Sequence, residues 1–168
     1  IMAALYEGVI AAGAISVVGS FDRGGQSLGF DADTVNLSAT MAGSGALFGI
    51  GVVTVNVSDP GADGDADGRV GDINQALALA QFSGTTINVG AGIYEFTGAL
   101  TISKSVALLG AGAGSTLLDF TGSASSSAID ITSGSGITIS GFEVRADNSQ
   151  ISGIAVSDTA SNITISDN

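Results

Sequence analysis

The chain has 168 residues, of which 26 are Gly and 45% are hydrophobic, while only 12% carry a charge. This composition excludes a charge-driven disordered chain and disfavours a helical bundle, because Gly is costly inside helices and helix-forming charged residues are scarce. Sixteen acidic residues face four basic ones, which gives a formal charge of −12. That charge disfavours binding to nucleic acid and makes cations such as Ca²⁺ the natural small partners of the surface.

Cys and His are both absent. The chain therefore has no disulfide and no thiolate chemistry, and it lacks the usual general base and the usual zinc ligand. The apolar run between Val9 and Val18 is too short to cross a membrane, so we expect no membrane insertion. We expect a secreted or cell-surface protein, and a piece of a longer one, because the sequence begins at Ile1 and stops inside a strand-like run.

Residues 1–54 read as a small β-rich segment or assembly arm. The clearest strand patterns cover Gly13–Val18, Thr34–Leu37 and Val52–Val57, and in the last of these runs apolar and polar residues alternate. The opening stretch Ala3–Ala12 is compatible with a strand or with a short helix, and the sequence leaves both open.

The most polar stretch of the chain is an acidic loop. Asp63, Asp65 and Asp67 occupy positions 1, 3 and 5 of a Ca²⁺-binding loop, Gly68 allows the sharp bend, and Asn74 stands at position 12. Asn74 cannot supply the bidentate carboxylate that such loops use at that position. A weak Ca²⁺ site and a plain solvated turn therefore both remain open.

A helix is predicted from Ile73 to Phe82. Asp72 is suited to cap its first turn, because a carboxylate accepts hydrogen bonds from the free backbone N–H groups, and Gly84 provides a stop. One face of this helix is apolar and consists of Ile73, Ala76, Leu77 and Ala80.

From residue 85 onward, pairs of aliphatic residues recur with one residue between the two members. The pair Ile129/Ile131 returns 25 residues later, and Ile137/Ile139 returns 26 residues later. Earlier pairs precede these by 29 and 31 residues. Periods of this length are typical of stacked repeats, and two short strands per repeat favour the coils of a parallel β-helix. The pairs are Ile87/Val89, Leu100/Ile102, Val106/Leu108, Ile129/Ile131, Ile137/Ile139, Ile154/Val156 and Ile163/Ile165.

Four runs in residues 55–168 carry a family resemblance. The runs 55–65 (VNVSDPGADGD), 72–80 (DINQALALA) and 84–94 (GTTINVGAGIY) resemble the N-terminal cap of pectate-lyase-like right-handed parallel β-helices. The run 100–119 (LTISKSVALLGAGAGSTLLD) is similar to the first coils of that superfamily. The resemblance implies an all-β, right-handed parallel β-helix with a short capping α-helix at its end, but it does not select one function, since the superfamily contains lyases, hydrolases, epimerases, tailspikes and non-enzymatic surface proteins.

A polysaccharide lyase or C5-epimerase needs a base, a proton donor and a group that neutralises a uronate. The candidates here are Tyr94, Lys104 and Arg145. Tyr94 is better explained as a packing residue, and Lys104 as a solvated residue in the turn between two strands. Arg145 is better explained as the ion-pair partner of Glu143 or Asp147. The Asp-Pro-His motif of the epimerases is absent.

A hydrolase site needs two carboxylates close together. Asp119, Asp130, Asp147 and Asp158 are spread over the repeats, and the Asp-Asp and Gly-His motifs of polygalacturonases are absent. The hydroxyl-rich residues Ser123–Ser127, Thr132, Ser133, Thr138 and Ser140 predict flat ladders that suit sugars, ice or a protein surface, or that simply form an exposed face.

These observations favour a non-catalytic extracellular β-helix module of a larger surface, adhesive or filament-forming protein. Its expected partners are copies of itself or another surface protein, and polysaccharide is a further candidate partner. The alternatives are the N-terminal part of a secreted polysaccharide lyase or mannuronan C5-epimerase-like enzyme, and a tailspike-like glycan-binding module. Only the first alternative would make the chain part of an enzyme.

Overall fold

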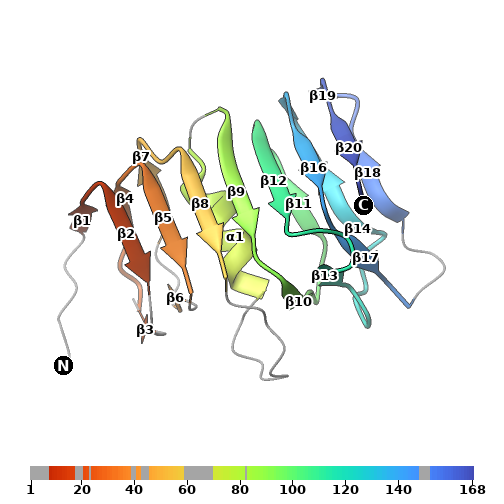
Figure 1. Ribbon diagram of the computed structural model, residues 1–168, viewed down its shortest axis with the longest axis horizontal. Coiled ribbons are helices and arrows are strands. Elements are labelled where there is room, and N and C mark those ends of the chain that lie inside the picture. Colours follow the sequence, from red (N-terminus) through yellow and green to blue (C-terminus); the bar gives the residue numbers. More distant parts are fainter. Residues whose placement is uncertain are drawn as a thin grey trace.

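The computed structural model describes residues 8–17, 21–22, 24–38, 41–42, 46–58, 70–81, 83–147 and 152–168. Among the described residues, strand residues far outnumber the ten residues of helix, which confirms the predicted all-β class. The strand pairings within these residues are all parallel. Figure 1 shows the strands side by side along the long axis, with a helix near the middle.

The longest sheet has seven strands and runs through the whole described chain; we call it the long sheet. Its strands follow sequence order across the sheet, so each strand lies beside the strand of this sheet that comes next along the chain. The strands are β2 (Ala14–Val17), β5 (Thr34–Leu37), β8 (Thr54–Val57), β9 (Thr85–Val89), β12 (Val106–Gly110), β16 (Thr138–Ser140) and β20 (Thr164–Ser166).

The first half of the chain adds two smaller sheets. One contains β1 (Gly8–Ala11), β4 (Leu28–Asp31) and β7 (Leu47–Ile50), and the other contains β3 (Phe21–Asp22) and β6 (Met41–Ala42). In both sheets the strands again pair with the equivalent strand of the next repeat.

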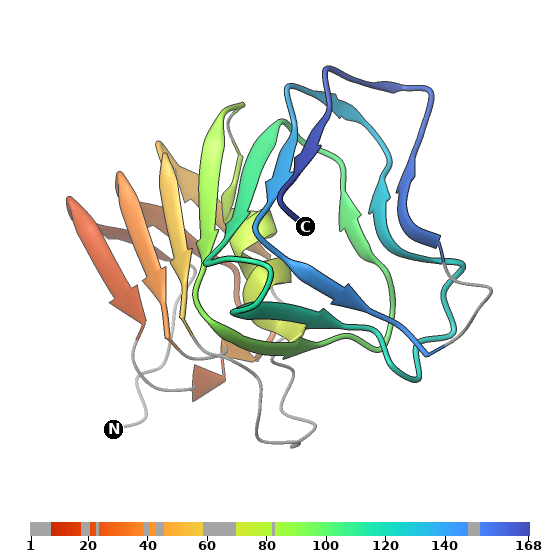
Figure 2. The same ribbon diagram turned by 45° about the vertical axis from the view of Figure 1, so that its right-hand side comes forward.

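The second half of the chain adds three smaller sheets, and Figure 2 shows the strands of this half on different sides of the interior. Their strands are β10 (Gly92–Glu95), β13 (Thr116–Asp119) and β17 (Glu143–Arg145); β11 (Leu100–Ile102), β14 (Ser127–Ile131) and β18 (Ser152–Val156); and β15 (Gly134–Ser135) and β19 (Ala160–Ser161).

The predicted stacking of the aliphatic pairs is confirmed by the strand register. Ile129 pairs with Ile154, and Leu100 pairs with Ile129 in turn. On the long sheet, Ile139 pairs with Leu108 on one side and with Ile165 on the other. Like side chains therefore lie on one another from repeat to repeat, which is how stacked repeats bury a core that no single repeat can close.

Residues 1–54, predicted as a small β-rich segment, contain a repeat that was not predicted from the sequence. Thr34 pairs with Ala14 and with Thr54, so equivalent residues are 20 positions apart. The predicted boundary after residue 54 falls at the first residue of β8, and the long sheet continues across it to β9. The division into two domains stays a prediction, but the described strands on both sides of the boundary belong to one sheet.

The helix α1 spans Val70–Leu79, whereas the sequence predicts Ile73–Phe82. Asp72 therefore lies inside the first turn and is not the residue that precedes the helix. Ile73, Ala76, Leu77 and Ala80 are buried, as the apolar face predicts. In the part of the chain that the structure describes, no helix has the length and hydrophobicity that crossing a membrane requires.

The position of α1 differs from the prediction of a cap at the end of the array. The helix packs on β6, β7, β8 and β9, and the long sheet has strands on both sides of it. Gly49 makes this contact possible: a Cβ atom there would lie 2.3 Å from the carbonyl oxygen of Leu79. An unpaired apolar helix face can be buried between two sets of strands as well as over an open end.

One column of aliphatic side chains in the core runs through all seven strands of the long sheet. It consists of Ile15, Val35, Val55, Ile87, Leu108, Ile139 and Ile165. The five inner members are fully buried, Ile15 is 8% exposed, and Ile165 is 45% exposed. Burying a side chain of this size stabilises the fold by about 1.5–3 kcal/mol, so the column is a main source of stability.

Candidate functional site

The predicted Ca²⁺ loop lies mostly outside the described residues. Asp63, Asp65, Asp67 and Gly68 belong to the undescribed range, and Asn74 is exposed within α1. Among the residues that are described, no group of three or more acidic, His or Cys side chains is placed to hold a metal ion. The Ca²⁺ site therefore stays a prediction.

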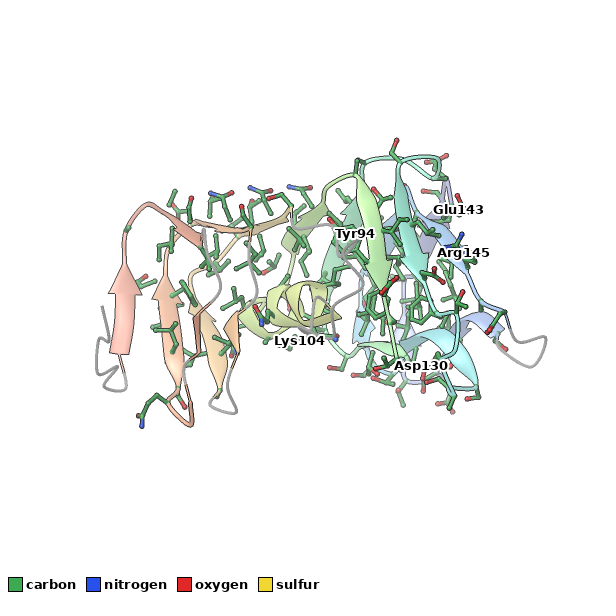
Figure 3. The ribbon with its side chains drawn as sticks, turned by 90° about the horizontal axis from the view of Figure 1, so that it is seen from below. Tyr94, Lys104, Asp130, Glu143 and Arg145 are labelled. Atoms are coloured by element: carbon green, nitrogen blue, oxygen red, sulfur yellow. The ribbon has the colours of Figure 1, made fainter. Side chains whose placement is uncertain are left out.

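Tyr94 and Lys104, the first two lyase candidates, are held in structural contacts. Tyr94 is fully buried in β10, and its hydroxyl donates to the carbonyl oxygen of Gly90 at 3.2 Å. Lys104 donates from Nζ to the carbonyl oxygen of Leu77 at 2.9 Å, which satisfies a carbonyl in the last turn of α1. Figure 3 shows Lys104 beside the helix. Both groups thus have a structural explanation.

Arg145 forms an ion pair with Asp119, and not with Glu143 or Asp147 as predicted. Its Nη2 atom lies 2.5 Å from Oδ2 of Asp119, which is its neighbour on the adjacent strand β13. The prediction failed because Glu143 lies two residues away along the same strand, about 6.6 Å, whereas neighbouring strands are only about 4.8 Å apart.

This ion pair lowers the pKa of Asp119 from 3.8 to about 2. The main cause is the hydrogen bond from Arg145; the backbone N–H and the hydroxyl of Thr121 also donate to Asp119, at 3.0 and 2.6 Å. The same pair raises the pKa of Arg145. Asp119 is therefore ionised at neutral pH and is not suited to act as a general acid.

The four candidate hydrolase carboxylates do not meet at one point. Asp119 lies in β13, whereas Asp130 lies in β14 of another sheet and accepts a hydrogen bond from Ser127. Asp147 accepts from the backbone N–H of Gly122 at 3.1 Å, and Asp158 accepts from the hydroxyl of Ser157 at 3.3 Å. Figure 3 shows Asp130 well apart from Glu143 and Arg145.

The predicted hydroxyl ladders are only partly present. Thr138 and Ser140 do lie on the outer face of the long sheet, paired with Thr164 and Ser166. However, Ser123 and Ser127 are buried, with 5% and 3% exposure. Thr132 and Ser133 donate from their hydroxyls to carbonyl oxygens of the previous repeat, those of Ile102 and Ser103.

The most regular polar surface is one that the sequence reasoning missed; we call it the Thr/Asn face. It is the outer face of the long sheet, with two outward residues on each strand. These residues are Ala14, Ser16, Thr34, Asn36, Thr54, Asn56, Thr86, Asn88, Ala107, Leu109, Thr138, Ser140, Thr164 and Ser166. The signal in the sequence is the recurring Thr-x-Asn or Thr-x-Ser triplet around an inward aliphatic residue.

A chain of side-chain hydrogen bonds orders the first part of the Thr/Asn face. The amide of Asn56 donates to the Oδ1 atom of Asn36 at 2.8 Å, and Asn88 donates to Asn56 at 2.9 Å. Asn36 in turn donates to the hydroxyl of Ser16 at 3.2 Å. Such amide ladders fix the side chains in one orientation on each successive strand.

Comparisons of the chain with protein-family models, with curated proteins and with solved structures find no match.

Proposed function

We propose that the chain is a non-catalytic extracellular module, built as a right-handed parallel β-helix of the pectate-lyase-like kind, that joins copies of itself end to end. The parallel register of all the described sheets supports this architecture, because each strand pairs with its equivalent in the next repeat. The arrangement of the strands in Figure 2, on several sides of a buried interior, is in keeping with it.

The contacts of the candidate catalytic groups support a structural role. Tyr94, Lys104 and Arg145 are each engaged with a neighbour: a backbone carbonyl, the last turn of α1 and Asp119, respectively. A reacting group would instead have to face the substrate within hydrogen-bonding distance.

The observation that carries the proposal is a pair of exposed aliphatic side chains on β18 and β20. Val156 and Ile165 point along the same columns as buried side chains of earlier repeats, yet they are 49% and 45% exposed. Among the described strands, β20 also has no neighbour on its outer edge. Exposed aliphatic residues on an open strand edge are a typical site for adding another strand.

A second copy of the chain supplies a matching edge at β2. In β2, Ile15 points inward between two outward residues, Ala14 and Ser16. In β20, Ile165 points inward between Thr164 and Ser166 in the same way. Pairing β20 with β2 of another copy would continue the long sheet and place Ile165 on Ile15. Because the two edges differ, this contact does not close on itself and leads to chains of subunits.

Charge opposes this association. Each copy carries a formal charge of −12, so two copies repel one another at low ionic strength. Screening by salt weakens that repulsion, and Ca²⁺ bound to the acidic loop would weaken it further. We therefore expect self-association to increase with salt and more strongly with Ca²⁺.

Sedimentation velocity across a range of protein concentrations, with and without Ca²⁺, tests the proposal. We expect species larger than the monomer, which are lost in Ile165→Lys and retained in the control Ile93→Lys. Ile93 is a matched control because it is a similarly exposed aliphatic residue, at 37%, on a different sheet. A sharp monomer at high concentration under all conditions would contradict the proposal.

A further inference from the structure

The Thr/Asn face is uncharged throughout. None of its fourteen outward residues is Asp, Glu, Lys or Arg, although the chain contains twenty such residues. The outward positions of other sheets do carry charge, for example Glu95 on β10, Asp130 on β14 and Glu143 on β17. A surface kept neutral on so acidic a protein fits an uncharged partner.

The Thr/Asn face repeats in two directions. Neighbouring strands lie about 4.8 Å apart, and the two outward residues of one strand lie about 6.6 Å apart, so the side chains form a near-rectangular grid. The strands β5, β8 and β9 carry complete Thr-x-Asn triplets, and β16 and β20 carry Thr-x-Ser. The grid is interrupted at β12, where the two positions are Ala107 and Leu109.

The chemistry of the grid suits water better than sugar. Each Thr presents a hydroxyl that donates and accepts, beside a methyl group that leaves adjacent water without a partner on that side. Aromatic side chains, which supply much of the flat apolar area against which proteins hold small rings, are absent from these fourteen positions. The amide ladder of Asn36, Asn56 and Asn88 holds these three side chains of β5, β8 and β9 in one orientation before any partner arrives.

We propose that the Thr/Asn face binds ice. An ice surface is an uncharged, rigid array of water molecules that donate and accept hydrogen bonds at regularly repeated positions. A rigid grid of hydroxyl, methyl and amide groups can order a layer of water that continues into that array, and it loses little side-chain entropy on binding. Because Leu109 interrupts the grid, we expect the strongest contact with ice over β5, β8 and β9.

Partition into a slowly growing ice front tests this assignment with the full chain. We expect the protein to be enriched in the ice relative to an inert soluble protein of similar size. Thr86→Tyr should reduce this enrichment to background, because a large ring at the centre of the grid holds the rest of the face away from the lattice. The matched control is Thr101→Tyr, which makes the same change at an exposed position of β11 on another sheet and should leave the enrichment unchanged.

Far-UV circular dichroism and thermal melting establish that each variant is folded, and Thr54→Tyr replaces Thr86→Tyr if the latter does not fold. Exclusion of the folded wild-type chain from ice would overturn the assignment. So would equal loss of enrichment in Thr101→Tyr. If the chain is excluded from ice and is retained on crystalline cellulose or chitin, the face is assigned to a polysaccharide instead. If it is excluded from ice and self-associates in a way that Thr86→Tyr abolishes, the face is assigned to a second copy of the chain. Because Ile165→Lys leaves this face intact, it should retain ice binding whether or not end-to-end association exists.

Discussion

Residues 8–58 and residues 85–168 build the same long sheet from repeats of different length. In the first region neighbouring strands of the long sheet are 20 residues apart, whereas in the second they are 21, 31 and 26 residues apart. The inward column is aliphatic in both, from Ile15 to Ile165. The comparison shows that the alternation of inward and outward residues is what the two regions share, while the length of chain between strands is free to vary.

The regions also differ in how their outward residues are held. The first region has the amide ladder of Asn36 and Asn56, which ends at Asn88 in β9. The second region has the ion pair of Asp119 and Arg145 across two strands. Each device joins one repeat to the next, so substitutions in either region should report on the stability of the stack.

The largest effect is expected inside the shared column, where the two regions meet. Ile87 is fully buried at that junction, and Ile87→Ala should lower the free energy of unfolding by about 2–5 kcal/mol, because it removes buried apolar contact and leaves a cavity. Thermal or denaturant unfolding measures the change. Ile165→Ala at the exposed end of the column is the control and should cost much less; equal costs would argue against a continuous column.

A smaller effect is expected at the contact between α1 and the first region. Gly49→Ala would place a methyl group 2.3 Å from the Leu79 carbonyl oxygen, so either the helix or β7 must shift. We expect a loss of about 1–3 kcal/mol in denaturant unfolding. Gly13→Ala, where nothing lies within 4 Å of the new atom, is the control. If both variants are equally stable, the helix does not pack on β7 as described.

The ion pair of the second region predicts a pH dependence. The pKa of Asp119 is lower in the folded protein, about 2, than its usual value of 3.8, so the pair stabilises the fold above about pH 4 and its contribution disappears as the pH falls through 2. We expect Asp119→Asn to cost about 1 kcal/mol at pH 7, since Arg145 is half exposed and the pair is partly screened. Urea unfolding of both proteins from pH 7 to pH 2 should show this difference shrinking below pH 4; a difference that does not change with pH would contradict the assignment.

The smallest effect is expected in the amide ladder of the first region. Asn56→Ala removes two side-chain hydrogen bonds, to Asn36 and Asn88, and should cost about 0.5–1 kcal/mol because the freed amides can bond to water. Asn88→Ala removes only the bond to Asn56, and should cost about half as much. Denaturant unfolding of the two variants compares them. A larger loss in Asn88→Ala would show that the ladder does not act through these bonds.

The second region could be predicted from sequence in some detail, because register in stacked repeats follows from pairs of aliphatic residues that recur at similar intervals. The recurrence of the aliphatic pair was enough to predict that Ile129 pairs with Ile154. The ion pair between Asp119 and Arg145 could not be predicted, because it depends on which residues the turns bring level on adjacent strands.

The first region was harder to read although its repeat is the more regular. The triplets at Thr34 and Thr54 are 20 residues apart, but each repeat is short and rich in Gly and Ala, so strand and helix patterns were difficult to separate before residue 12. The start of α1 at Val70 was missed because capping at Asp72 is locally favourable, while the helix that packs against β7 and β8 begins and ends three residues earlier than predicted. The acidic loop at Asp63, Asp65 and Asp67 lies outside the described residues, and its Ca²⁺ site stays a prediction.

The most direct test of the shared sheet measures the distance between β8 and β9, where the two regions join. Because the chain has no Cys, spin labels can be attached through the paired substitutions Asn56→Cys and Asn88→Cys, and read by continuous-wave electron paramagnetic resonance. Adjacent in-register strands predict strong spin–spin broadening at a separation of about 5 Å, and a control pair, Asn56→Cys with Leu109→Cys, predicts clearly weaker broadening at about 10 Å, two strands apart. A spectrum of the first pair with no broadening, or no stronger broadening than the second, would contradict a sheet that runs through both regions.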